Sequence, residues 1–277
     1  MRVLCPTQDS QEWFDFRLNK VTASCSYEAS HMVEKGSKVR GDKRWESSAG
    51  RKAYISELAW GMINRIPVEH FVSRAMDLGK QYEKLARAEY GFRFAPDETV
   101  QRTGFVLHPT LDFLGASPDG LLENGGVELK VPQLPRHKML LETGNIPPEW
   151  VTQCYCNMLC CEKEWWDFAS YMPADEQFGL EAVHMPTEFR MYRHRFYRND
   201  AIFAQIEEGA ASAIEEALKK VEFLRRMYPA KGSPKSKLAT ELAMSHEALA
   251  ASEMDSDMAD TLAAYDEYVM GTSPEAA

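Results

Sequence analysis

Short apolar stretches separated by turn-forming residues fill the middle of this 277-residue chain. They cover residues 100–108, 113–117, 120–122 and 127–131, and Pro, Gly, Asp and Asn lie between them. Apolar or alternating runs of this length, bounded by turn residues, predict an antiparallel meander of strands. The segments on either side of this strand cluster then decide the fold class.

Helical periodicity flanks the strand cluster on both sides. Two further strands are expected at 166–172 and 189–197. This order of helices, strands, helix, strands and helix predicts an α/β fold of the mixed α+β kind in one domain. The segments with helical spacing of apolar residues are 11–18, 51–64, about 73–90, 148–161 and 200–228.

The composition changes after residue 228. Residues 229–237 are rich in Pro, Gly, Ser and Lys, which is typical of a linker, and residues 238–277 hold nine acidic side chains and no Lys or Arg. We therefore predict a folded domain over 1–228 and a linker with an acidic tail over 229–277. The tail is either solvated and partly disordered, or it docks a partner protein or a neighbouring subunit.

Charge and cysteine content narrow the class of protein. Residues 1–237 carry all 32 Lys and Arg but only 33 of the 42 Asp and Glu, so most of the net charge of −10 lies in the last 40 residues. The nearly neutral remainder is therefore compatible with nucleic-acid binding. No apolar run approaches the roughly 18 residues of a membrane span, and the first residues lack the apolar region of a secretory signal. Six cysteines, two of them adjacent, fit reduced thiols, so we expect a cytoplasmic protein without a membrane association.

The candidate chemistry lies in residues 115–131. Glu128 and Lys130 are two apart in a predicted strand, so both side chains leave the same face, and Asp119 ends the preceding strand. Neighbouring antiparallel strands bring side chains to about 5 Å, so Asp119 can lie beside Glu128. Two carboxylates suit Mg²⁺ or Mn²⁺ with a substrate phosphate, and Lys130 can orient the attacking water. The pattern predicts phosphodiester hydrolysis; the alternative is a surface hairpin with an ordinary Glu–Lys pair.

Motifs in a fixed order extend this pattern along most of the chain. They are Trp13-x-x-x-Arg17, Val21-Thr-Ala-Ser24, Gly79-Lys-Gln-Tyr-Glu83, Ser117-Pro-Asp-Gly, Glu128-Leu-Lys-x-Pro and Gln153. Over roughly residues 11–225 their order resembles that of the phage lambda exonuclease family, viral recombination nucleases of the PD-D/E-x-K superfamily. The resemblance implies a restriction-endonuclease-like core, in which a central mixed sheet is flanked by helices.

The resemblance also implies roles for single residues. The divalent ion, Mg²⁺ with Mn²⁺ as a substitute, would be held by Asp119, Glu128 and the backbone carbonyl of Leu129. Lys130 matches the catalytic lysine, and the remaining catalytic positions are Glu83, on a helix that reaches the metal, and Gln153, near the attacking water.

A second implied site grips the end of the DNA. Arg17, Ser24 and Ser117 match the residues that hold the terminal 5′-phosphate, where one guanidinium and two hydroxyls can bind the phosphate oxygens. Arg136 and Lys138 follow the active strand, so they are candidates for contacts with the DNA backbone. Arg40, in a basic segment over 34–50, is the candidate strand-separating residue; a solvated loop arginine is the alternative.

These residues together predict a Mg²⁺-dependent 5′→3′ double-strand DNA exonuclease that leaves 3′ single-stranded overhangs. The resemblance implies a ring-shaped homotrimer around the DNA, and a single-strand annealing protein as partner in phage-type recombination. Two alternatives stay open. One is a structure-specific endonuclease or repair nuclease of the same superfamily, and the other is a non-catalytic DNA-binding accessory protein.

Four cysteines near one predicted helix raise the alternative of an iron–sulfur cluster. On a helix, Cys154 and Cys161 share one face while Cys156 and Cys160 share another, so four thiolates do not converge. Buried free cysteine packs as a small apolar residue. Packing between helices is therefore the preferred interpretation of these thiols.

Overall fold

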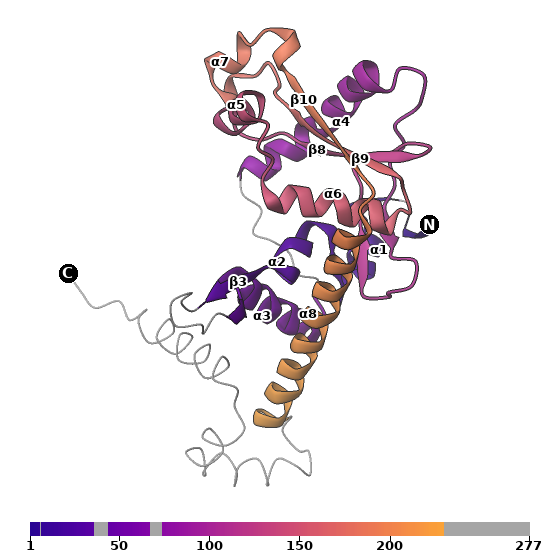
Figure 1. Ribbon diagram of the computed structural model, residues 1–277, viewed down its shortest axis with the longest axis vertical. Helices are drawn as coiled ribbons and strands as arrows, with labels where there is room; N and C mark the ends of the chain where they lie inside the picture. The colour runs from indigo at the N-terminus through magenta and orange to yellow at the C-terminus, as the bar shows by residue number, and fades with distance from the viewer. Residues whose placement is uncertain (6, 36–43, 67–73, 230–277) are drawn as a thin grey trace, which may run out of the picture. The chain divides into compact units, whose positions relative to one another are not determined.

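The computed structural model describes residues 1–5, 7–35, 44–66 and 74–229 (Figure 1). Its contacts divide the chain into two compact units, 1–221 and 222–277. The architecture that follows is that of the first unit. Arg40 and nearly all of the predicted linker and tail lie outside the described residues, and the predicted boundary after residue 228 stays a prediction.

One mixed sheet of four strands combines two strands from residues 2–22 with two strands from residues 105–116. Its order is β1 (Arg2–Cys5), β5 (Phe105–Leu107), β6 (Leu114–Ala116) and β2 (Val21–Thr22). The strand β5 pairs antiparallel with both of its neighbours, whereas β2 runs parallel to β6.

A second mixed sheet carries the strand with the candidate chemistry. Its order is β10 (Met191–Tyr197), β9 (Trp165–Tyr171), β8 (Gly125–Lys130) and β7 (Gly120–Leu121). The strand β8 is parallel to β9 and antiparallel to β7. A separate hairpin joins β3 (Met32–Lys35) to β4 (Arg44–Ser47), so both ends of the basic segment 34–50 are ordered strand or helix.

The predicted antiparallel meander is wrong, although the mixed α/β class with helix-flanked mixed sheets is confirmed. The chain leaves the first sheet after β6 and enters the second at β7, so the predicted strands divide between two sheets. Both edges of β8 are occupied, one by β7 and the other by β9, which lies about 40 residues later in the sequence. A local pattern of apolar runs holds no information on such a distant partner.

The predicted helices form close to their expected positions. Hydroxyl groups begin two of them, since Ser10 Oγ accepts a hydrogen bond from Trp13 N and Ser48 Oγ accepts one from Arg51 N. Short 3₁₀ turns cover Ala23–Cys25, Glu176–Phe178 and Thr187–Phe189. The helices are α1 (Gln11–Arg17), α2 (Ser26–Ser30), α3 (Ala49–Asn64), α4 (Arg74–Phe94), α5 (Leu134–Thr143), α6 (Pro148–Cys160), α7 (Leu180–Val183) and α8 (Asp200–Met227).

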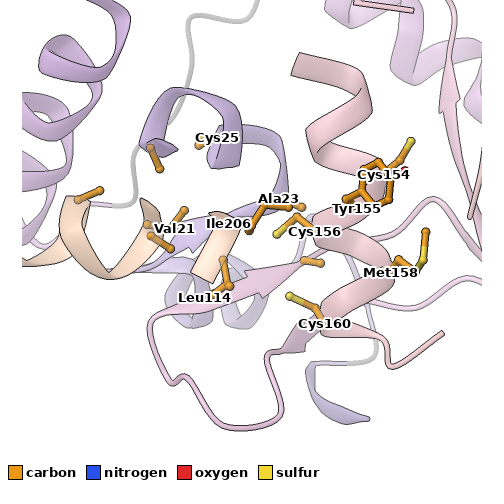
Figure 2. Packing of buried hydrophobic residues seen from close by; sticks show 14 of the residues in the cluster. Val21, Ala23, Cys25, Leu114, Cys154, Tyr155, Cys156, Met158, Cys160 and Ile206 are labelled. Carbon is orange, nitrogen blue, oxygen red and sulfur yellow. The ribbon is translucent and has the colours of Figure 1, made fainter. Parts of the chain in front are cut away.

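Helix α6 runs through the larger part of the core. It packs against β6, β8 and β9 and against α2, and its buried side chains meet those of α8 and the first sheet (Figure 2). The cysteines of this region are buried free thiols, and burial raises the pKa of Cys154, Cys160 and Cys161 well above the usual thiol range. Protonated thiols in such a place pack as small apolar groups.

Alternate residues of β8 enter two different clusters. Val127 and Leu129 pack with Leu78, Ala86 and Tyr90 of α4. Glu128 lies in register with Phe168 of β9, which belongs to the cluster around α6. The two-residue period of a strand thus turns Glu128 and Lys130 toward α6 and their neighbours toward α4. None of the described helices combines the length and apolar character that crossing a membrane requires.

Candidate active site

The turn from Ser117 to Gly120 links the two sheets and carries Asp119. Gly120 is paired with Val127, so Asp119 stands level with Glu128 at the start of β7. A side chain at Gly120 would lie 2.4 Å from Val100, which explains why the turn ends in glycine. Asp119 Oδ2 accepts a hydrogen bond from the backbone N–H of Leu129 at 2.7 Å. The structure thus places Asp119 opposite Glu128, as the sequence pattern suggested, while its role as a metal ligand stays a prediction.

Glu128, Lys130 and Gln153 form one hydrogen-bonded group between β8 and α6. Lys130 Nζ donates to Glu128 Oε1 at 2.6 Å and to Gln153 Oε1 at 3.0 Å. Glu128 is 2% exposed, whereas a quarter of the Lys130 side chain reaches solvent. The second carboxylate oxygen, Glu128 Oε2, accepts a hydrogen bond from Asn157 Nδ2 at 2.8 Å. The structure therefore brings three of the predicted residues into direct contact.

Helix α4 supplies Glu83 together with a residue that the sequence analysis missed. Arg87, one turn after Glu83, forms an ion pair with it and donates from Nε to the backbone oxygen of Asp119 at 2.6 Å. Arg87 thus ties the α4 carboxylate to the turn that carries Asp119. The spacing of Glu83 and Arg87, i and i+4 on a predicted helix, was the available signal.

The charges of this group perturb one another. Burial raises the pKa of Asp119 well above its ordinary value, and the negative charges of Glu128 and Glu83 raise it further. Burial by itself would lower the pKa of Lys130, but the charges of Glu128 and Asp119 outweigh it, so the pKa of this amine is raised. The charges of Glu128 and Glu83 therefore disfavour ionisation of Asp119, and Lys130 stays an ammonium.

The donor set fits a hard divalent cation. Mg²⁺ is bound in proteins through one or two carboxylates with several waters, and Asp119 with Glu128 supplies two, beside the Leu129 backbone. A dication would relieve the repulsion that raises the pKa of Asp119. Among the described residues, no three His, Cys, Asp or Glu side chains are grouped closely enough to hold an ion together. Glu83 as a further ligand therefore stays a prediction.

Two of the three predicted phosphate-binding residues meet beside this site. Arg17 Nη1 lies 3.4 Å from Ser117 Oγ, and Trp13 Nε1 donates to the same oxygen at 2.9 Å. The Arg17 guanidinium stacks 4.2 Å from the Trp13 ring centroid, which fixes its plane. Ser24 is exposed, with its hydroxyl 3.1 Å from Thr22 Oγ1. Ser117 is two residues from Asp119, so the Arg17–Trp13–Ser117 group lies next to Asp119 in the chain.

The candidate DNA-contacting residues of α5 have protein partners at the surface. Arg136 stacks 4.7 Å from the centroid of Trp150 and lies 3.6 Å from a carboxylate oxygen of Glu149. Lys138 is paired with Glu181 at 2.8 Å. Exposed ion pairs of this kind are weak, so DNA phosphates can compete for both side chains. Their role in DNA binding stays a prediction.

A mixed α/β fold with two carboxylates and a lysine on adjoining strands is compatible with a nuclease, and comparison with known proteins agrees. The model of the YqaJ-like viral recombinase domain matches residues 12–164, more than half of the chain. The chain therefore belongs to the YqaJ-like viral recombinase family, the family of lambda exonuclease. Among curated proteins, no sequence matches it significantly.

Solved structures support the same assignment. Two crystal structures of the alkaline exonuclease LHK-Exo from Laribacter hongkongensis, one of them in complex with dAMP, are 31% and 30% identical to this chain, with TM-scores of 0.63 and 0.64. Each match covers 78% of this chain and 97% of that chain. A phage related exonuclease from Haemophilus somnus 129PT shares the fold at 13% identity and a TM-score of 0.57, covering 74% of this chain and 96% of its own. A nuclease role for this chain is thus supported.

Proposed function

We propose that this chain is a Mg²⁺-dependent exonuclease that digests one strand of duplex DNA from its 5′ end and leaves a 3′ single-stranded overhang. The observation that carries the proposal is the position of Lys130, held between Glu128 and Gln153 near the partly buried Asp119. Family membership and the likeness to an alkaline exonuclease support the same reaction class.

The chain's own groups have separable tasks. Asp119, Glu128 and the Leu129 carbonyl would hold the divalent ion, which when bound polarises the scissile phosphate and lowers the pKa of a coordinated water. Lys130 keeps its proton because its pKa is raised, so its Nζ donates hydrogen bonds to water or to a phosphate oxygen on which charge develops. Gln153 Oε1 accepts from that ammonium and sets its direction.

End dependence and polarity are proposed from the adjoining Arg17–Trp13–Ser117 group. A guanidinium held flat by Trp13 can bind two phosphate oxygens at once, and the Ser117 hydroxyl can supply a further hydrogen bond. A terminal 5′-phosphate offers more oxygens and more charge than an internal phosphodiester. A group of donors of this kind would therefore favour ends over internal positions.

The assembly and the partners are proposals that rest on the family resemblance. They comprise a homotrimer, an annealing protein that binds the overhang, and a role in phage-type recombination in the cytoplasm of a bacterial host. Light scattering of the full chain tests the trimer. Deletion of 229–277 tests whether the acidic tail docks the annealing protein, since unchanged binding would assign the docking surface to the folded part.

The central experiment compares three DNA substrates in Mg²⁺. Linear duplex with 5′-phosphoryl ends should be digested, the same duplex with 5′-hydroxyl ends should be cut much more slowly, and closed circular duplex should stay intact. The variant Lys130→Ala should be nearly inactive while it still binds the ends. Cleavage of the closed circle would support an endonuclease instead, and no cleavage of any substrate would support a non-catalytic accessory protein.

A further inference from the structure

Helix α6 buries an amide group against the active-site glutamate. Asn157 is 0% exposed and lies one turn after Gln153, so both residues face β8. Its Nδ2 donates to Glu128 Oε2 at 2.8 Å. Its Oδ1 is buried and has no hydrogen-bond partner within the described part of the chain.

The buried amide is only half satisfied. A buried carbonyl oxygen without a partner loses its hydrogen bonds to water and gains none in return. A leucine of similar size at this position would avoid that loss, but it would leave the buried Glu128 Oε2 without this hydrogen-bond donor. The single hydrogen bond of the Asn157 side chain goes to Glu128, so its benefit must be sought there.

The amide completes the restraint on the Glu128 carboxylate. Lys130 from the same strand holds Oε1, and Asn157 from α6 holds Oε2. With both oxygens held from two elements, the carboxylate group cannot rotate about its last bond. Each carboxylate oxygen has two lone pairs, so one on each oxygen stays available. An amide also adds no charge, whereas a second cation here would compete with a metal ion.

We propose that Asn157 is a positioning residue that fixes the Glu128 carboxylate for a divalent cation. The inference rests on the proposed metal-dependent nuclease function. It assigns to Asn157 an effect on metal affinity and on the rate of hydrolysis, in addition to the one hydrogen bond that its side chain contributes to the fold. Partners that orient a metal ligand typically change the affinity for the metal 10–100-fold when they are removed.

The test uses Asn157→Leu in the full chain, with Met158→Leu as the matched control. Met158 is the next residue on α6 and is also 0% exposed, and leucine conserves its volume. Three quantities are measured for each protein: the Kd for Mn²⁺ by calorimetry without DNA, the Tm without metal, and the rate of duplex digestion over a range of Mg²⁺ concentrations.

For Asn157→Leu we expect a modestly lower Tm because Glu128 Oε2 loses its donor, a Kd for Mn²⁺ raised about 10-fold or more, and a digestion rate that recovers partly as Mg²⁺ increases. Met158→Leu should match the wild type in Mn²⁺ affinity and Mg²⁺ dependence. Wild-type Mn²⁺ affinity in Asn157→Leu would overturn the proposal. So would a digestion rate that does not recover at high Mg²⁺, because both results describe a structural residue.

Asn157→Ser covers the case in which leucine does not fit. Serine removes the amide without adding bulk, and the same rise in the Kd for Mn²⁺ is expected. If neither variant folds, Asn157 is a structural residue and the proposal is overturned. The wild-type arm separates this inference from the proposed function. A wild type that binds no Mn²⁺ and cuts no DNA refutes the function, whereas active wild type and unaffected variants refute only the role of Asn157.

Discussion

Replacing Arg87 with methionine separates the stability of the α4 contact from its effect on the active site. The Arg87 side chain is only 11% exposed and bridges Glu83 and the backbone oxygen of Asp119. Methionine keeps the aliphatic bulk and removes both the charge and the donors. The turn at Asp119 then loses its only side-chain link to α4 among the described contacts.

The expected loss of stability follows from these two contacts. A hydrogen bond from a charged donor contributes about 1.5–3 kcal/mol, and an ion pair one helical turn apart adds about 0.5 kcal/mol. A total of about 2–3.5 kcal/mol lowers the Tm of a domain of this size by about 4–14 °C. Displacing a reacting group by about 1 Å costs about 100-fold in rate, so the kcat for digestion should fall by about that factor.

Arg93→Met is the control for stability. Arg93 lies on the same helix, pairs with Glu89 at 2.6 Å and donates to the backbone oxygen of Thr187 at 2.8 Å, so it makes the same kinds of contact away from the site. Thermal melts should place the two variants close together. Digestion rates measured well below both melting temperatures should fall only in Arg87→Met. Equal rates in the two variants would refute the positioning role of Arg87.

Two further predictions concern stability. Burial lowers the pKa of His137, whose ring nitrogens contact Ser170 Oγ and the Phe189 carbonyl, so the folded state disfavours its protonation. The free energy of unfolding should therefore fall as the pH drops below about 6.5. Melts of His137→Gln between pH 5.5 and 7.5 should show a smaller fall, and an equally steep fall would contradict this prediction. Gly126→Ala would place a Cβ 2.4 Å from the buried Trp166 ring and should lower the free energy of unfolding by about 1–3 kcal/mol. Gly79→Ala, in an open position on α4, should raise it by about 0.5–1 kcal/mol. Denaturant melts in which both variants change the free energy of unfolding in the same direction would contradict this packing.

Much of the fold could be predicted because the relevant signals are local. Helical spacing placed α3, α6 and α8 within a few residues of their observed ends, and the two-residue period of a strand placed Glu128 and Lys130 on one face. The parallel partner of β8, which is β9, could not be predicted. The pairing of residues 125–130 with 165–170 depends on how α5 and α6 fold between them. For the same reason the division into two sheets was missed.

The candidate site shows the same limit. Gln153 was predicted from its place in a family pattern, and its contact with Lys130 agrees with that prediction. Arg87 and Asn157 each lie one helical turn from a predicted residue and so share its helix face, yet the sequence does not say which atoms they contact. Their importance depends on contacts with Asp119 and Glu128 that only folding creates.

Ser117 and Asp119 are separated by a single proline. Its ring fixes one backbone angle and restricts that of the residue before it, and Gln8 Nε2 donates to the Pro118 carbonyl at 3.0 Å. Two residues of chain span at most about 7 Å. In a nuclease that binds the DNA end through Ser117, the distance from the terminal phosphate to the bond that is cut would therefore be set by this short, rigid segment of backbone. No conformational change would be needed to define the length of each cut product.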